Sequence, residues 1–201
     1  LFKKISMTDF KVVLSGQGGD EALMGYLKYY FYAILQAAKK GNFLWLIKLI
    51  FGALFNKTIF NQFNFKNANK YINNTSNSNF IIESNFNQKF NFRNLKDRQI
   101  LDIKKYSVPP LTRYEDRNSM MYGIETRHPF LDHRLIEFCL CLKDNFLIDN
   151  GWNKYILRKS FNEIPKQIRF RKDKRGFDVS HETFLRNELS HMFFELFKNS
   201  K

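Results

Sequence analysis

The side chains most able to do chemistry gather in a polar, glycine-rich turn at residues 15–21, Ser-Gly-Gln-Gly-Gly-Asp-Glu. Three glycines within four positions allow positive φ angles and let a ligand approach the backbone closely. The free N–H groups of such a turn, and of a helix that follows it, can bind an anion such as a phosphate. The turn matches neither a P-loop nor the G-x-G-x-x-G pattern, so its spacing leaves a nucleotide site and an ordinary strand-to-helix turn equally open.

Two acidic residues close this turn, and their types allow two interpretations. Asp20 and Glu21 can stabilise the first turn of a helix, where the helix dipole favours negative charge. A carboxylate at this place can also hold Mg²⁺ or a ribose hydroxyl beside bound phosphates.

The residues on either side of the turn predict a strand before it and a helix after it, which would place the turn at the end of a strand. The apolar run at residues 12–14 predicts a β-strand, and open α/β sheets bind ligands at the carboxyl ends of their strands. Apolar residues three and four apart predict one long helix over residues 20–40 that ends at Gly41. A second apolar helix is predicted over residues 43–55, and the two would pair as a hairpin.

Helical spacing returns in the second half of the chain. It predicts helices over residues 94–106 and 111–122, with two prolines before the second, and a further helix capped by Asp132. Residues 57–94 are dense in Asn and Phe, which indicates a variable helical insertion with no assigned chemistry.

Composition limits the class of protein. The 201 residues carry 33 basic and 19 acidic side chains, a net charge of +14, which fits an anionic ligand or an acidic partner domain. Nucleic-acid binding is less favoured, because no binding motif accompanies the charge. Cys139 and Cys141 lack zinc or disulfide spacing, so at least one should face the core, and His128 and His133 are expected to be structural. With no signal peptide and an apolar run at 43–55 too short to span a bilayer, the cytoplasm is the expected location.

Four blocks of residues carry a resemblance to a known family. The second reads Arg-Tyr-Glu-Asp-Arg-Asn-Ser-Met from residue 113 and continues to residue 135; the others are residues 15–21, 150–159 and 171–177. In this order and spacing they closely resemble the synthetase domain of glutamine-dependent asparagine synthetase. The resemblance covers residues 10–180 apart from a gap at 45–95.

The resemblance implies a fold and a domain organisation. Residues 1–201 would be the C-terminal, mostly helical portion of an α/β domain of the adenine-nucleotide α-hydrolase-like (PP-loop) type, built on a parallel sheet. Two parts of the family's chain are missing: the N-terminal glutaminase domain and the Ser-Gly-Gly-x-Asp-Ser pyrophosphate loop. The isolated chain is therefore expected to be inactive, whereas the complete protein can form a homodimer.

The resemblance also implies a reaction. The family uses ATP and Mg²⁺ to convert the side-chain carboxylate of aspartate into β-aspartyl-AMP, and ammonia from glutamine then displaces AMP to give asparagine. Aspartate, ATP and ammonia are the implied partners, and neither a membrane nor a nucleic acid is among them.

Individual roles are carried over only to positions that match the family's motifs. The adenylate would be contacted by residues of the turn: Ser15, Gly16 and Gly18, with Asp20 as a further polar and Mg²⁺ ligand. Four charged residues would line the same cleft. Asp116 and Glu125 are the catalytic candidates among them, and Arg117 and Arg127 would bind the cofactor. Lys154 would stabilise the leaving pyrophosphate, and Arg158, four residues on along a predicted helix, would aim a second cation at the phosphates.

One catalytic candidate departs from the family's pattern. Gln17 stands where many members have a glutamate implicated in adenylate formation, so the hydrogen-bonding shape is kept and the charge is lost. This leaves open an amidotransferase that acts on another carboxylate, such as one attached to a sugar. A non-catalytic remnant also stays open, because the pyrophosphate loop is missing.

Overall fold

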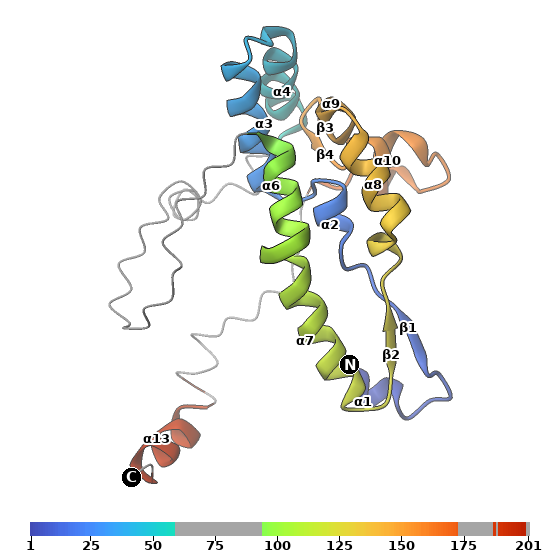
Figure 1. Cartoon of the computed structure of the whole chain (residues 1–201), viewed down its shortest axis with the longest axis vertical. Coiled ribbons are helices and arrows are strands. Elements are labelled where there is room, and N and C mark those ends of the chain that lie inside the picture. The colour runs from blue at the N-terminus through green and yellow to red at the C-terminus, as the bar shows by residue number, and fades with distance from the viewer. Residues whose placement is uncertain (59–93, 173–186, 188, 200–201) are drawn as a thin grey trace.

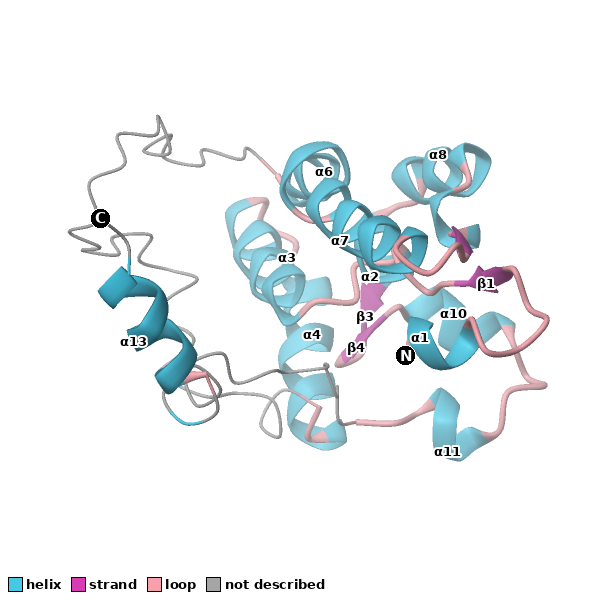
Figure 2. Cartoon of the chain, turned by 90° about the horizontal axis from the view of Figure 1, so that it is seen from below, coloured by secondary structure: helices cyan, strands magenta, loops and turns pink. Residues whose placement is uncertain are grey.

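The computed structural model of the chain describes residues 1–58, 94–172, 187 and 189–199. Within them the fold is mostly helical, with one parallel and one antiparallel pair of strands (Figures 1 and 2). The first part holds α1 (Phe2–Ile5), β1 (Val12–Leu14), α2 (Gly19–Ala22), α3 (Leu27–Lys39) and α4 (Phe43–Asn56). The second part holds α6 (Leu95–Leu101), the π-helical η1 (Asp102–Tyr106), α7 (Val108–Met120), β2 (Glu125–Arg127), the 3₁₀ turn η2 (Pro129–Leu131), α8 (His133–Cys141), α9 (Asp144–Leu147), β3 (Ile148–Asp149), β4 (Trp152–Asn153), α10 (Tyr155–Ser160), α11 (Lys166–Arg169) and α13 (Ser190–Asn199).

The predicted strand at residues 12–14 is confirmed as β1, which pairs in parallel with β2 (Figure 1). The register sets Val12 opposite Glu125 and Leu14 opposite Arg127. Because side chains alternate along a strand, these four share one face of the small sheet. Parallel strands need a crossover connection, and here the helices from α2 to α7 provide it.

The predicted helical hairpin is confirmed as α3 and α4, which lie side by side at one end of the molecule (Figures 1 and 2). Gly41 follows α3 with φ +65°, the left-handed conformation common where helices end. Asn42 caps α4 by accepting a hydrogen bond from the Trp45 N–H. Between the helices, the hydroxyl of the fully buried Tyr30 donates to the Leu49 carbonyl at 2.7 Å.

The prediction of one unbroken helix over residues 20–40 is wrong. The chain leaves helical geometry after α2, where Met24 has φ +53°, and becomes helical again at α3. The Asn153 side-chain amide donates to the carbonyls of Met24, at 2.7 Å, and Tyr26, at 2.9 Å. Gly25, a poor helix former, also stands in the break and donates its N–H to the Asp20 carbonyl at 2.7 Å, so local and tertiary interactions both end α2 here.

A buried charge network connects α6, η1 and α7, which form one helical column (Figure 1), to the helical hairpin. Asp102 is fully buried at the start of η1 and accepts a hydrogen bond from the Tyr29 hydroxyl at 2.8 Å. Its carboxylate also lies 2.8 Å from both Arg98 and Lys28. Burial lowers the pKa of Lys28, and the contact with Asp102 opposes that shift.

The antiparallel strands β3 and β4 form a hairpin that packs on α4. Asn150 and Gly151 make the two-residue turn with φ +48° and +81°, the positive angles that Asn-Gly turns adopt. Gly52 of α4 lies directly against this turn, and a Cβ on Gly52 would collide with the Asn150 backbone. At the same contact, the Thr58 hydroxyl donates a hydrogen bond to the Gly151 carbonyl at 2.5 Å.

Some of the remaining predictions are confirmed, and others concern residues outside the described ranges. Asp132 caps α8 as predicted, by accepting from the Arg134 N–H at 2.9 Å. Cys139 is buried in the core and Cys141 is exposed, as expected for two free thiols. Most of the predicted insertion, residues 59–93, and most of the fourth block lie outside the described residues. Across the described residues, none of the helices combines the length and apolar character needed to cross a membrane.

Candidate functional site

The carboxyl ends of β1 and β2 meet at the start of the glycine-rich turn. The Ser15 N–H donates to the Arg127 carbonyl at 2.8 Å, which extends the parallel pairing by one bond. The Ser15 hydroxyl donates to Oε2 of Glu115 on α7 at 2.9 Å. The same hydroxyl accepts a longer bond, 3.3 Å, from the Gln17 N–H. Ser15 thus joins both strands, the turn and α7 at one point.

The glycines of the turn have different surroundings. Gly18 has φ +87°, and a Cβ there would collide with the Leu131 side chain. Gly19 is buried against the ring of Phe130. Gly16 is exposed, with no atom within 4 Å of the place that a Cβ would take. The backbone at Gly16 is therefore open to a ligand, whereas Gly18 and Gly19 serve the packing of the turn on η2.

The two acidic residues after the glycines point to different parts of the molecule. Glu21 is buried and accepts hydrogen bonds from the hydroxyls of Tyr26, at 2.7 Å, and Ser107. These bonds tie α2 to the start of α7, and burial raises the pKa of Tyr26. Asp20 instead meets Lys154, with 2.8 Å between Oδ1 and Nζ. Glu21 is thus structural, and Asp20 belongs to the partly open side of α2.

The ion pair between Lys154 and Asp20 connects the third motif block, residues 150–159, to the first, residues 15–21. The Lys154 side chain is 31% exposed and that of Asp20 is 27% exposed, so solvent reaches both. Lys154 has φ +53° and precedes α10, so the prediction that Lys154 and Arg158 share one helix face is wrong. Gly25 lies against the ion pair, and a Cβ there would collide with both side chains.

Arg158 is held by the backbone around it. Its guanidinium donates to the carbonyls of Asn153, at 2.9 Å, and Arg169, and it lies 4.7 Å from the Trp152 ring centre. Burial lowers the pKa of Arg158. The described structure therefore uses this cation to fix the segment on either side of Lys154.

The predicted charged residues of α7 and β2 are exposed. Glu125 and Arg127 pair with each other at 2.7 Å on the open face of the sheet, which lowers the pKa of the Glu125 carboxyl and raises that of Arg127. Asp116 and Arg117 are exposed on α7. The structure does not bring these four side chains into the contacts that surround Ser15.

Two residues that the sequence prediction left out of the site do contact its centre. Glu115 accepts the Ser15 hydroxyl, and His128 Nδ1 lies 3.9 Å from the same carboxylate oxygen. Glu115 stands four residues before the buried Ser119, so helical periodicity signals that it faces inward while Asp116 does not. His128 follows β2 directly, and no sequence signal separates it from a structural histidine.

The side chains near the turn offer few ligands for a metal ion. Among the described residues, no three His, Cys, Asp or Glu side chains come together to form a metal cluster. Mg²⁺ in nucleotide sites is commonly held by only one or two carboxylates, with substrate phosphates and waters as its other ligands. Asp20, a partly exposed carboxylate four residues after Gly16, fits this arrangement of few protein ligands.

Comparison with known proteins identifies the family. The family model described as "Asparagine synthase" matches residues 1–201, the whole chain. The chain belongs to the asparagine synthase family. No solved structure matches it at a significant level.

Individual relatives are similar over shorter stretches. "Asparagine synthetase [glutamine-hydrolyzing] 2" of Bacillus subtilis is 28% identical over 175 residues, which cover 81% of this chain and 21% of that protein. "Asparagine synthetase [glutamine-hydrolyzing] 1" of the same organism is 26% identical over 110 residues, 55% of this chain and 17% of the relative. The Gallus gallus "Asparagine synthetase [glutamine-hydrolyzing]" is 45% identical over 60 residues, 28% and 11% of the two chains. The chain spans only 11–21% of the length of these relatives.

Proposed function

We propose that the complete protein is an ATP-dependent amide ligase that converts aspartate into asparagine through β-aspartyl-AMP, with ammonia from glutamine. Membership of the asparagine synthase family supports a ligase of this kind. The observation that carries the proposal is the contact between Lys154 and Asp20, which joins the third motif block to the glycine-rich turn across 133 intervening residues. We also propose that the fold is of the PP-loop type, that the glutaminase activity belongs to a further domain and that the protein acts in the cytoplasm.

The turn would bind the adenylate. Gly16 offers open backbone at the carboxyl end of β1, and Ser15 lies beside it with its hydroxyl held by Glu115. Gly18 supports this arrangement through its positive φ, because it lets the chain turn into α2. When bound, Mg²⁺ would neutralise phosphate charge, and Asp20 is the carboxylate placed to hold it.

Lys154 would act on the leaving group. The aspartate carboxylate attacks the α-phosphorus of ATP, a new P–O bond forms, and the bond to the β-phosphate oxygen breaks. Negative charge then builds on the departing pyrophosphate, and a fixed ammonium stabilises it more than it stabilises bound ATP. The backbone bonds of Arg158 keep the segment around Lys154 in place, so we assign Arg158 a supporting role and not a phosphate contact.

The remaining predicted residues would line the open side of the site. Asp116, Arg117, Glu125 and Arg127 are exposed charges around the ends of α7 and β2, where they can attract or exclude charged substrates. Gln17 is in the turn itself and can donate or accept a hydrogen bond without carrying charge. Because of Gln17, a second candidate function is retained: amidation of a carboxylate other than that of free aspartate.

The proposal is tested in the full-length protein by the change Lys154→Ala. We expect pyrophosphate formation in a single turnover with aspartate and ATP to slow by about 10²-fold or more, the usual loss when one electrostatic stabiliser is removed. Glutamine hydrolysis should change far less, because it needs no phosphate contact. Lys159→Ala, at an exposed lysine of α10, is the matched control and should leave both rates unchanged.

Two outcomes would contradict parts of the proposal. If Lys154→Ala leaves pyrophosphate formation within about a factor of two, Lys154 does not stabilise the transition state. If the unmodified protein forms pyrophosphate with other carboxylates but not with aspartate, the second candidate function replaces the first.

A further inference from the structure

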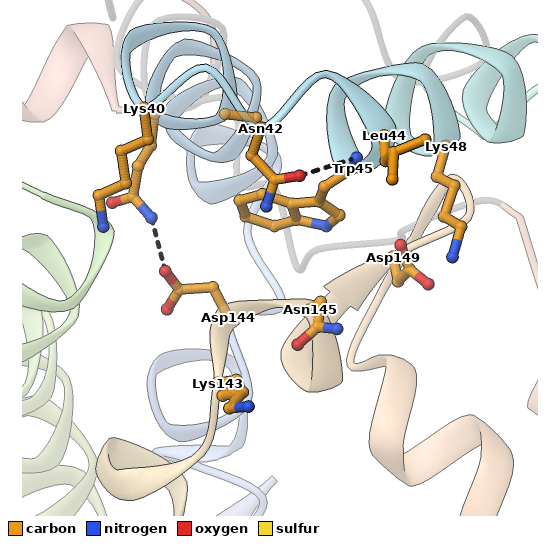
Figure 3. Close-up of a pocket in the computed structure, with 11 residues that line it drawn as sticks. Lys40, Asn42, Leu44, Trp45, Lys48, Lys143, Asp144, Asn145 and Asp149 are labelled. Carbon is orange, nitrogen blue, oxygen red and sulfur yellow. Dashed lines mark hydrogen bonds between the residues drawn. The ribbon is translucent and has the colours of Figure 1, made fainter.

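A pocket lies where the α3–α4 connection meets α9 and β3 (Figure 3). These elements are at the end of the molecule opposite to β1 and β2 (Figure 1). Its volume is about 470 Å³, within the range of pockets that bind small molecules. None of the residues to which the family resemblance gives a role lines it. Its lining is mostly polar and charged, and Trp45 forms one wall (Figure 3).

Asp149 is the unusual member of this lining. The residue is only 8% exposed, and its Oδ2 accepts a hydrogen bond from the Asn150 side-chain amide at 2.8 Å. Its Oδ1 is buried and has no hydrogen-bond partner in the part of the chain that the structure describes. A buried acceptor without a donor costs about 1–3 kcal/mol, and more when it is charged, so a donor is expected at this atom.

The other carboxylate of the pocket belongs to Asp144, which is only partly buried. Asp144 accepts a hydrogen bond from the Gln36 side-chain amide at 2.6 Å. It also interacts electrostatically with Lys96 on α6. Each aspartate therefore accepts from one side-chain amide, and Asp149 differs in that its second oxygen is buried without a donor among the described residues.

Three lysines surround the same space. Lys40 and Lys48 come from α3–α4, and Lys143 precedes α9 (Figure 3). Lys48 is near enough to Asp149 to oppose the effect of burial, which raises the pKa of that carboxyl. Within the described residues, however, no ion pair of 4 Å or less joins any of these lysines to a carboxylate. Three lysines against two aspartates leave the lining with one excess positive charge.

We propose that this pocket is a second ligand site, which binds a small acidic amino acid. Its ammonium group donates to Oδ1 of Asp149, and its two carboxylates face Lys40, Lys48 and Lys143. An ammonium supplies the missing donor, and a ligand with one net negative charge matches the one excess positive charge of the lining. Succinate, which has the two carboxylates and no ammonium, would lose the contact to Asp149.

The test uses Trp45 as a local reporter. The sequence has two tryptophans, Trp45 and Trp152. The change Trp152→Phe, made in the full-length protein, leaves Trp45 as the one tryptophan of these 201 residues. The probes are L-aspartate and succinate, titrated at pH 7. We expect a saturable fluorescence change, with aspartate binding about tenfold or more tightly than succinate, the gain of one charge-assisted hydrogen bond.

Variants assign the preference to the pocket. Asp149→Asn keeps an acceptor for Asn150 and should abolish the preference for aspartate, whereas Asp132→Asn, at a capping aspartate outside the pocket, should retain it. Lys143→Met changes an exposed lysine, so the fold is kept, and both ligands should bind more weakly. Lys154→Ala should not alter these titrations, which separates this site from the proposed site of adenylate formation.

Three results would overturn the inference. The first is no saturable change with either ligand. The second is equal affinity for aspartate and succinate, which would mean that the lysines attract any dianion. The third is a preference for aspartate that survives in Asp149→Asn.

Discussion

Buried apolar side chains are concentrated in the helices, although α4 also has a large exposed apolar face, whereas none of the apolar side chains of β1 is buried. In what we call the helical half, α2–α4, α6 and β3–β4, fully buried side chains include Tyr29, Tyr30 and Leu49. The strand half consists of α1, β1 and β2 with the residues that directly follow each strand, and the chain from the second half of α7 to β2. In it, Leu14 is 71% exposed and Met121 is 76% exposed. The hydrophobic contribution to stability follows buried area, so the helical half contributes most of it.

The chemistry-bearing residues lie mainly where packing is weaker. Ser15, Glu115 and His128 gather at the ends of the two strands, in the strand half. Asp20 and Lys154 stand at the boundary, each fixed from the helical half by α2 and by the β3–β4 hairpin. The packed half therefore positions the site while the strand half exposes it, and the two halves should respond differently to substitution.

The largest expected effect is at the buried charge network of the helical half. Asp102→Asn removes the charge that faces Arg98 and Lys28, whose side chains are only 15% and 16% exposed. Leaving two mostly buried cations without their counter-charge should lower the free energy of unfolding by about 3 kcal/mol. Urea denaturation of the variant and the unmodified protein measures this difference in the free energy of unfolding. Asp132→Asn, at an aspartate whose side chain is 35% exposed, is the control and should have a much smaller effect, because asparagine also caps a helix.

An equal loss in both variants would contradict the comparison. It would show that the network around Asp102 is no more important than a surface ion pair.

The next effect tests the close approach of α4 and the β-hairpin. Gly52→Ala gains helix propensity, but its Cβ would collide with the Asn150 backbone, which cannot rotate away as a side chain can. Overpacking of this kind should lower the free energy of unfolding by about 2 kcal/mol. Gly16→Ala is the matched change in the strand half, where nothing lies within 4 Å, and it should change stability by less than about 0.5 kcal/mol. A tolerated Gly52→Ala would mean that the hairpin is not seated on α4.

The sequence predicted local elements better than the contacts between them. Periodicity was sufficient for α4, and the apolar run was sufficient for β1, because both signals are local. The break between α2 and α3 had one local signal, Gly25, which the prediction of an unbroken helix overlooked. The hydrogen bonds from Asn153 to Met24 and Tyr26 had none, because Asn153 is far along the chain.

The same distinction applies to the candidate site. Motif resemblance pointed to Ser15, Asp20 and Lys154, which the structure places at or beside the turn. It pointed to Asp116 in place of its neighbour Glu115, because a motif gives position along the chain and not the direction in which a side chain points. Helical phase would have distinguished the two, since Glu115 shares a face with the buried Ser119.

The smallest expected effect is on the open face of the sheet. Leu14→Thr replaces a side chain that is 71% exposed with one that suits a β-strand, so the free energy of unfolding should change by less than about 0.5 kcal/mol. Ile124→Val, at a fully buried residue just before β2, removes one methylene group and should cost about 1 kcal/mol, which shows that the strand half is folded during the measurement. If Leu14→Thr instead costs more than Ile124→Val, this face is covered in solution, and the contrast between a packed helical half and an open strand half does not hold. Both values come from urea denaturation of the same preparation, so the ranking of the two variants, and not either value alone, decides the question.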